Sequence, residues 1–237
     1  MRAVLLVLWG VSILFAGAQA LRAQEVTLDE GTFTIYEGDT EVGTETFSIR
    51  ASGSGADRRV VAGARVHVTG GGSPRDTETA LELRGDDEHV VRYTAQVAGA
   101  EPLDVRYEED APGRLSMIRR TSVGERAREM RAPDGMLVLD AGVVHHLHFA
   151  AARLRAGARQ LPILVPIEGE SGTVTLRDAG AGSVRVAGTE VSAQRMRVES
   201  SNGAALEVWL DGAGRVLAVE RTAERGVAFR AVRTRVP

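Results

Sequence analysis

The sequence contains no cysteine and no lysine, few aromatic residues, and only one long apolar run. Without cysteine the chain has no disulfide, thiol nucleophile or thiolate metal site, and we expect no lipid anchor attached through cysteine. The 29 basic residues, all arginine, stand against 32 acidic residues, which gives a formal net charge of −3. Nucleic acid and anionic membrane surfaces are bound through concentrated basic surfaces, so neither is expected as a partner.

The apolar run lies at the start of the chain and has the layout of an export signal. A basic start precedes the run Ala3–Phe15, and small residues with an A-x-A cleavage pattern follow it. The run is too short for a permanent membrane span, and no similar run comes later. We expect residues 1–23 to be a signal peptide, cleaved between Ala20 and Ala23. Residues 24–237 are then expected to form a single β-rich domain in the periplasm or outside the cell.

Most of the remaining sequence alternates apolar and polar residues, which is typical of half-buried antiparallel strands. Segments 33–36 and 46–50 alternate in this way and are joined by a glycine-containing turn, which predicts a hairpin. Segment 206–219 has the same layout around a second glycine-containing turn. Short turns separate the other runs, so we predict a mainly β fold: a curved antiparallel meander, or half-open barrel, of ten or more strands. The highly charged run 124–131 predicts an edge strand.

One segment departs from the period of two. Between Asp140 and Gly157 apolar residues recur at steps of three and four, with Asp140 suited to the N-cap and Gly157 to the C-cap. This pattern predicts one helix of about four turns, packed on the sheet. The residues from Val143 to Phe149 also alternate, so a strand is the alternative there. Leu161–Pro166 predicts a strand near a sheet edge, because proline cannot donate to a central ladder.

Two segments resemble parts of a known group of proteins. Phe33–Ile49 looks like the opening hairpin, and Val208–Val219 like the closing hairpin, of uncharacterised exported bacterial domain-of-unknown-function proteins. Those proteins are similar in layout to the half-barrels of periplasmic lipoprotein carriers, which hold acyl chains in a concave sheet covered by helices. The resemblance implies a cavity for an apolar ligand and supplies no catalytic residue.

Histidines are the strongest candidates for a metal site. His145 and His148 are three residues apart in the predicted helix and would share one face. A third ligand would come from a strand, either His89, which is in phase with inward-facing residues, or His67, which is not. No spaced metal signature accompanies them, so the alternative is that they are ordinary helix-surface or interface histidines and that the chain binds no metal or cofactor.

Catalysis has little support in the sequence, because the acidic pairs lie in turns and no serine stands in a nucleophile elbow. We therefore predict a non-enzymatic periplasmic protein that binds a lipid or another apolar or amphiphilic ligand in a concave sheet. The side chains expected to line its cavity are Phe47, Tyr93, Leu147, Phe149 and Trp209. The phase of Trp209 opposes that of its neighbours, which also fits a packed structural residue.

Two alternative functions remain open at this point. One is a structural or interaction module of the cell envelope, with a filled interior and a protein partner. The other is a metal-dependent hydrolase that uses His145 and His148.

Overall fold

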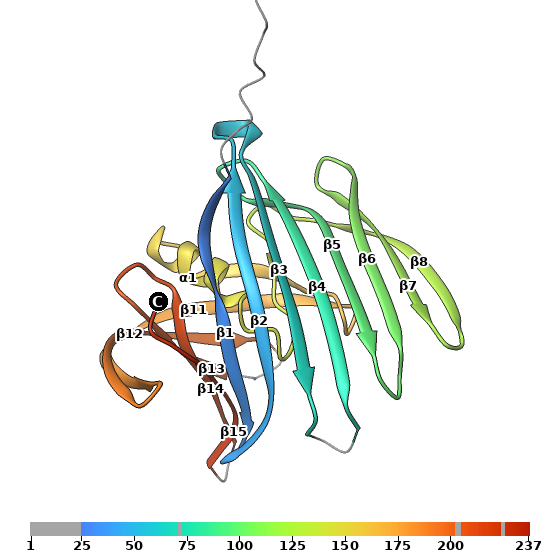
Figure 1. Ribbon diagram of the computed structural model, residues 1–237. Helices are drawn as coiled ribbons and strands as arrows, with labels where there is room; N and C mark the ends of the chain where they lie inside the picture. Colours follow the sequence, from blue (N-terminus) through green and yellow to red (C-terminus); the bar gives the residue numbers. More distant parts are fainter. Residues whose placement is uncertain (1–24, 71–72, 202–204, 224–225) are drawn as a thin grey trace, which may run out of the picture.

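The computed structural model describes residues 25–70, 73–201, 205–223 and 226–237, and the predicted signal peptide lies outside them. These residues form one sheet of fifteen strands, in the order β8-β7-β6-β5-β4-β3-β2-β1-β15-β14-β13-β12-β11-β10-β9 (Figure 1). Neighbouring strands pair antiparallel except for β9 and β10, which are parallel. The sheet is curved and is not closed into a barrel, so the predicted mainly β, half-open antiparallel meander is confirmed.

The strands follow one another with short connections along the chain. Their bounds are β1 Val26–Glu37, β2 Thr40–Ser52, β3 Arg59–Val68, β4 Arg75–Arg84, β5 His89–Ala98, β6 Leu103–Ala111, β7 Arg114–Thr121, β8 Gly124–Arg131, β9 Leu137–Val138, β10 Gln160–Val165, β11 Glu170–Val186, β12 Thr189–Ser200, β13 Ala205–Leu210, β14 Val216–Ala223 and β15 Gly226–Arg233. A short 3-10 turn covers Gly55–Asp57, and α1 covers Leu147–Arg155. In the described part of the chain no helix is long and apolar enough to cross a membrane.

The two halves of the sheet meet where β1 pairs with β15. Strands β1 to β8 lie side by side in chain order, and β9 to β15 do the same in the other half. At the join, Phe33 lies opposite Arg233, whose side chain is buried. Arg233 forms an ion pair with the buried carboxylate of Asp29 and donates a hydrogen bond of 3.1 Å to the carbonyl oxygen of Glu30. A buried polar contact therefore fixes the first strand to the last.

Both halves of the sheet contribute to one apolar core. In Figure 1 strands β11 and β12 run across the direction of β1 to β5, and α1 lies beside them. The core contains Ile49 of β2, Leu81 of β4, Leu176 of β11 and Ala150 of α1, all fully buried or nearly so. Buried and exposed residues alternate along β3 to β6, as the period of two predicts. The helix is thus packed against the concave side.

The two predicted hairpins and the predicted edge strand are confirmed. The turn between β1 and β2 contains Gly38 at φ 59°, and the turn between β13 and β14 contains Gly214 at φ 81°. Glycine reaches these left-handed conformations without steric cost. Strand β8 ends the sheet, and every residue in it except Met130 is exposed. Strand β10, predicted near an edge, has only the two-residue β9 beyond it.

The helix starts later than predicted. It begins at Leu147, and the residues from Asp140 to His146 form turns, so neither the long helix nor the alternative strand is correct for that segment. Gly142, at φ 79°, has a left-handed backbone conformation that interrupts a right-handed helix. The predicted stop is confirmed, because Gly157 at φ 94° directly follows the last helical turn.

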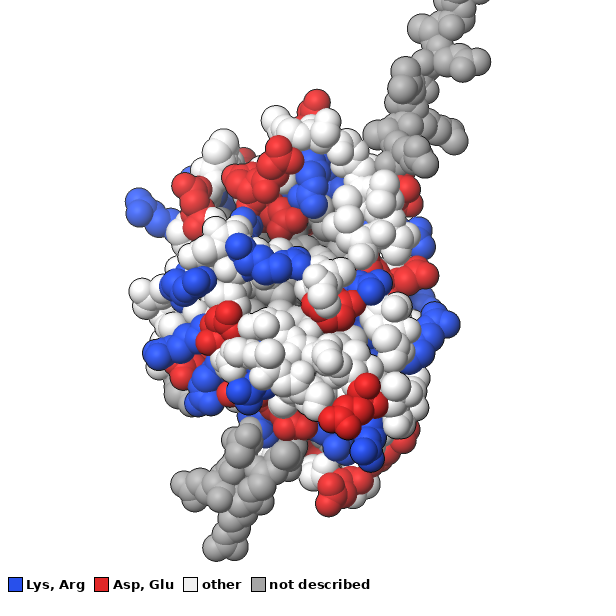
Figure 2. Space-filling model, turned by 90° about the vertical axis from the view of Figure 1, so that its left-hand side faces the viewer, with Lys and Arg blue, Asp and Glu red and all other residues white. Residues whose placement is uncertain are grey.

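Charges of both signs are spread over the surface. On the face shown in Figure 2, acidic and basic side chains are interspersed around an uncharged central area. Neither sign is concentrated there, as the nearly balanced composition predicts.

Candidate functional site

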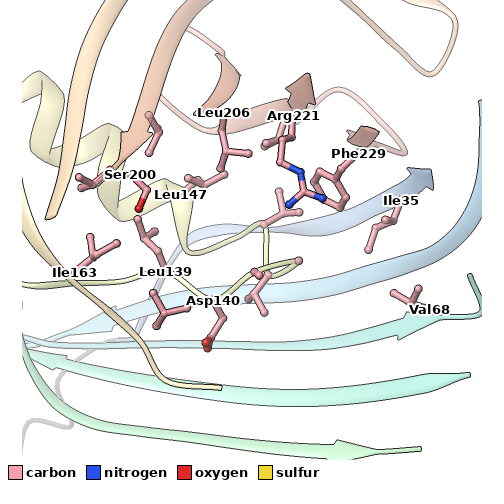
Figure 3. Close-up of a pocket in the computed structure, with 18 of the residues that line it drawn as sticks. Ile35, Val68, Leu139, Asp140, Leu147, Ile163, Ser200, Leu206, Arg221 and Phe229 are labelled. Atoms are coloured by element: carbon pink, nitrogen blue, oxygen red, sulfur yellow. The ribbon is translucent and has the colours of Figure 1, made fainter. Parts of the chain in front are cut away.

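The concave side of the sheet contains a cavity of about 460 Å³ (Figure 3). It lies between strands β1 to β4, the C-terminal half of the sheet and the connecting segment, Leu139–His146, which joins β9 to α1. Its volume is in the range of about 300–1,000 Å³ that is usual for small-molecule sites. The wall is mainly apolar and is formed by Ile35, Val42, Val68, Leu139, Val143, Val144, Leu147, Ile163, Val165, Val174, Val198, Leu206, Val219 and Phe229.

A second hollow, of about 610 Å³, lies against the β5–β6 and β7–β8 turns. Turn residues form most of its wall, and few core side chains reach it. We therefore regard the first cavity as the candidate site.

A buried carboxylate holds the connecting segment against the sheet. Glu45, on the inward face of β2, is fully buried. Its Oε2 accepts a hydrogen bond of 2.6 Å from the backbone N–H of Val144. Its Oε1 accepts two bonds of 2.8 Å, from the backbone N–H and the Nδ1 of His145. Glu45 thus satisfies backbone donors just before α1, as an N-cap side chain would, although it comes from a distant strand.

A second carboxyl group fixes the start of the same segment. Asp140 accepts hydrogen bonds from the hydroxyl of Tyr93 and, at 2.8 Å, from the backbone N–H of Ile167. Asp140 is not the predicted N-cap, because its side chain points to these partners instead of to the first turn of α1. Burial raises the pKa of Asp140 to about 7, because the charged form is poorly solvated there. Burial and the neighbouring Asp140 also raise the pKa of Tyr93, which stays a neutral donor.

Two adjacent histidines are the last residues of the connecting segment. The rings of His145 and His146 are fully buried, with centroids 4.5 Å apart, and the ring of Phe47 is stacked at 5.8 Å from His145. Burial, and to a smaller extent His145, lowers the pKa of His146 well below its usual value. This ring is therefore neutral at physiological pH, and it packs as part of the core.

The predicted metal ligands are not brought together. His145 lies in the turns before α1 and its Nδ1 is engaged by Glu45, whereas His148 lies on α1 with its Nδ1 3.9 Å from Asp29. No group of three or more potential ligands surrounds a common point in the described residues. His145 and His148 therefore do not share a helical face, because α1 starts after His145. They contact different carboxylates instead of a common ligand position.

The inward orientation predicted for His89 is wrong. Its side chain is 38% exposed and lies 3.6 Å from the carboxylates of both Asp87 and Glu109. A bulge at Val91 places Val90 on the inward face and reverses the phase of the residues before it. His67 faces the polar side as predicted, with its Nδ1 2.6 Å from Asp76.

Of the five residues predicted to line a ligand cavity, Leu147 alone reaches its wall. Phe47 and Tyr93 are buried beneath the connecting segment, and Phe149 packs into the core on another side of α1. Phe47 and Tyr93 do face inward, as their strand phase predicts, but the connecting segment covers them. Trp209 packs on the opposite face of the sheet, in a small cluster with Val186, Ala193 and Leu217. The opposing phase of Trp209 in the sequence therefore correctly indicated a packed structural residue on the other face.

Sequence reasoning missed the charged residues that matter most to this site. Glu45 is in phase with Phe47 and Ile49 on β2, and Arg221 is in phase with Val219 on β14. A charged residue at an inward position of an alternating strand is a readable signal, because such positions are otherwise apolar.

No protein-family model matches the sequence, and no curated protein matches it.

Proposed function

We propose that the protein is an exported, non-enzymatic binding protein for an apolar or amphiphilic ligand, which it holds in the cavity on the concave side of the sheet. The observation that carries this proposal is the 460 Å³ space between the sheet and the connecting segment, with an apolar wall. Space lined by apolar side chains gains stability when an apolar guest fills it. The resemblance to acyl-chain carriers, implied by the two hairpins, points in the same direction.

The expected energetics follow from the apolar wall. Burying one methylene group is worth about 0.8 kcal/mol, so each added methylene is expected to strengthen binding about fourfold. Affinity should rise along a series of fatty acids until the cavity is filled and then level off.

A fluorescent polyene fatty acid provides the direct test. We expect its emission to rise on binding to the purified mature chain and natural fatty acids to displace it. The variant Val198→Phe places a ring into the cavity, where Val198 is part of the wall, and is expected to abolish this binding. The control Val191→Phe lies in the cluster on the opposite face and should bind like the parent protein. No fluorescence change and no thermal shift with fatty acids or phospholipids would refute the proposal.

Export is tested separately from ligand binding. The mature protein recovered from a cell envelope fraction is expected to begin between residues 21 and 24, which N-terminal sequencing establishes.

The two alternatives have weaker support. A filled interior was the feature that would favour an interaction module, and the cavity argues against it. The free edge of β8 also carries five charged residues, which discourage strand addition by a partner. A metal-dependent hydrolase lacks support in the geometry of His145 and His148 described above.

A further inference from the structure

Three charged side chains face the cavity at one end of the sheet. Glu37 is the last residue of β1, Arg75 is the first residue of β4, and Arg221 lies two residues before the end of β14. Strands β1 and β14 run in the same direction and β4 runs in the opposite one. The end of β1, the start of β4 and the end of β14 are therefore at the same edge, the lower one in Figure 1.

Each of these residues continues the inward phase of its strand. The residues two positions further into the same strands are Ile35, Thr77 and Val219, which are buried. The buried charged residues of the inner face, such as Glu45 and Arg233, have polar partners in the protein, whereas the three charged residues at this edge form no ion pair in the described residues. Charged residues there mark the edge at which the apolar cavity meets water.

Arg221 extends over the cavity. It lies opposite Phe229 on β15, and its guanidinium carbon is 5.9 Å from the centre of that ring. In Figure 3 the side chain of Arg221 extends from its strand into the space between the walls, with its guanidinium beside Phe229. This position places a cation at the end of an otherwise apolar chamber.

In the described part of the chain the two arginines at this edge form no ion pair, although Arg75 interacts at longer range with Asp140 and with Glu168, beside which it also lines the second hollow. Neither Arg75 nor Arg221 has a carboxylate oxygen within 4.0 Å there, and the Nε of Arg75 donates only to the hydroxyl of Thr77, at 3.3 Å. Glu37 faces the same edge without forming an ion pair to either arginine. Asp140 lines the same cavity, but burial raises its pKa to about 7, so it is only partly charged at neutral pH. Two guanidinium groups against Glu37 and a partly protonated Asp140 leave a net positive charge for a ligand to meet.

We propose that the ligand is an amphiphile with an anionic headgroup, a carboxylate or a phosphate, which Arg221 and Arg75 bind while its apolar chain fills the cavity. This inference rests on the proposed function and names the chemistry of its ligand. Guanidinium groups match the two oxygens of a carboxylate or phosphate in paired hydrogen bonds.

Ligands of one chain length and different headgroups test the proposal. A fatty acid, its primary alcohol, its primary amine and a monoacyl phosphate are titrated against the full chain by displacement of the fluorescent fatty acid. We expect an anionic ligand to bind about tenfold more tightly than the alcohol, the effect of one charge-assisted hydrogen bond, and the amine to bind most weakly. The comparison of the fatty acid with the monoacyl phosphate identifies which anion is preferred.

Two arginine variants test whether Arg221 and Arg75 cause the preference for an anionic headgroup. Arg221→Gln and Arg75→Gln are each expected to reduce the preference for the anion over the alcohol, with alcohol binding unchanged. The control is Arg230→Gln, because Arg230 also stacks on an aromatic ring, that of Tyr36 at 4.5 Å, but on the outward phase of β15. This control should keep the full preference. Alcohol binding serves as the check that each variant is folded.

The outcomes separate the two proposals. If no headgroup permits binding, the proposed function itself is refuted. If the acid, the alcohol and the amine bind equally well, the cavity is a ligand site but the anion preference is wrong. If Arg221→Gln and Arg75→Gln retain the preference in full, the arginines do not bind the headgroup.

Discussion

Glu45 is expected to be the residue on which the position of the connecting segment depends. The informative perturbation is Glu45→Gln, which keeps the size of the side chain and replaces one carboxylate oxygen with an NH₂ group. The amide oxygen can retain both bonds from His145, at the position of Oε1. The NH₂ group then faces the backbone N–H of Val144, which now approaches a donor instead of an acceptor 2.6 Å away.

The size of the effect follows from that one mismatch. Leaving a buried donor without its charged partner costs about 2–3 kcal/mol. For a chain of this length, 1 kcal/mol corresponds to about 2–4 °C, so we expect the Tm to fall by about 4–12 °C. Because the segment forms part of the cavity wall, affinity for the fluorescent fatty acid should fall as well.

Thermal unfolding and amide hydrogen exchange measure the two consequences. Exchange at Val144 and His145 is expected to accelerate more than exchange in the strands. The control is Glu78→Gln, because Glu78 is 59% exposed and forms only a surface ion pair with Arg65, at 3.4 Å. Its stability should change by less than about 0.5 kcal/mol. Equal Tm values for the two variants would show that Glu45 does not hold the segment.

Three further outcomes are expected. The folded protein keeps a proton on Asp140, with a pKa of about 7 against an ordinary 3.8, that the unfolded chain releases at lower pH. Its contribution to stability therefore declines between about pH 4 and pH 7, by up to about 4 kcal/mol, and Asp140→Asn, which resembles the protonated form, should lack this decline in urea unfolding. Identical pH profiles of the two proteins would contradict this reasoning. Phe149→Ala should cost about 3–5 kcal/mol in denaturant unfolding, because Phe149 is a buried core residue, without changing the preferred ligand length. Leu147→Ala should enlarge the cavity and shift the preference to longer chains, and an unchanged preference would place the ligand elsewhere.

The sheet could be predicted from the sequence because its hairpins and its charged edge are each determined by residues close together in the chain. Alternation around Gly38 and Gly214 defines the hairpins, and the charges of 124–131 define an edge. The bulge at Val91 could not be predicted, because one extra residue reverses the inward phase without a distinctive residue type. His89 was misplaced for that reason.

The site was harder to predict because its contacts are distant in sequence. The pattern between Asp140 and Gly157 indicates a helix, yet its start is set by Gly142 and by Glu45, about one hundred residues earlier. The cavity wall likewise combines positions of both halves of the sheet, and periodicity within one strand says nothing about which of them a connecting segment covers. Only the charged residues at inward positions, Glu37, Arg75 and Arg221, indicate from the sequence the edge where a ligand would enter.

The pairing of β1 with β15 has a consequence for how the chain matures. Strand β1 pairs with β15, which all the other described strands precede in the sequence, so the two halves of the sheet cannot be joined until β15 has been made. Contacts of such long sequence separation form slowly. Until β15 arrives, one edge of β1 has no pairing partner, and an unpaired edge is open to pairing with another chain.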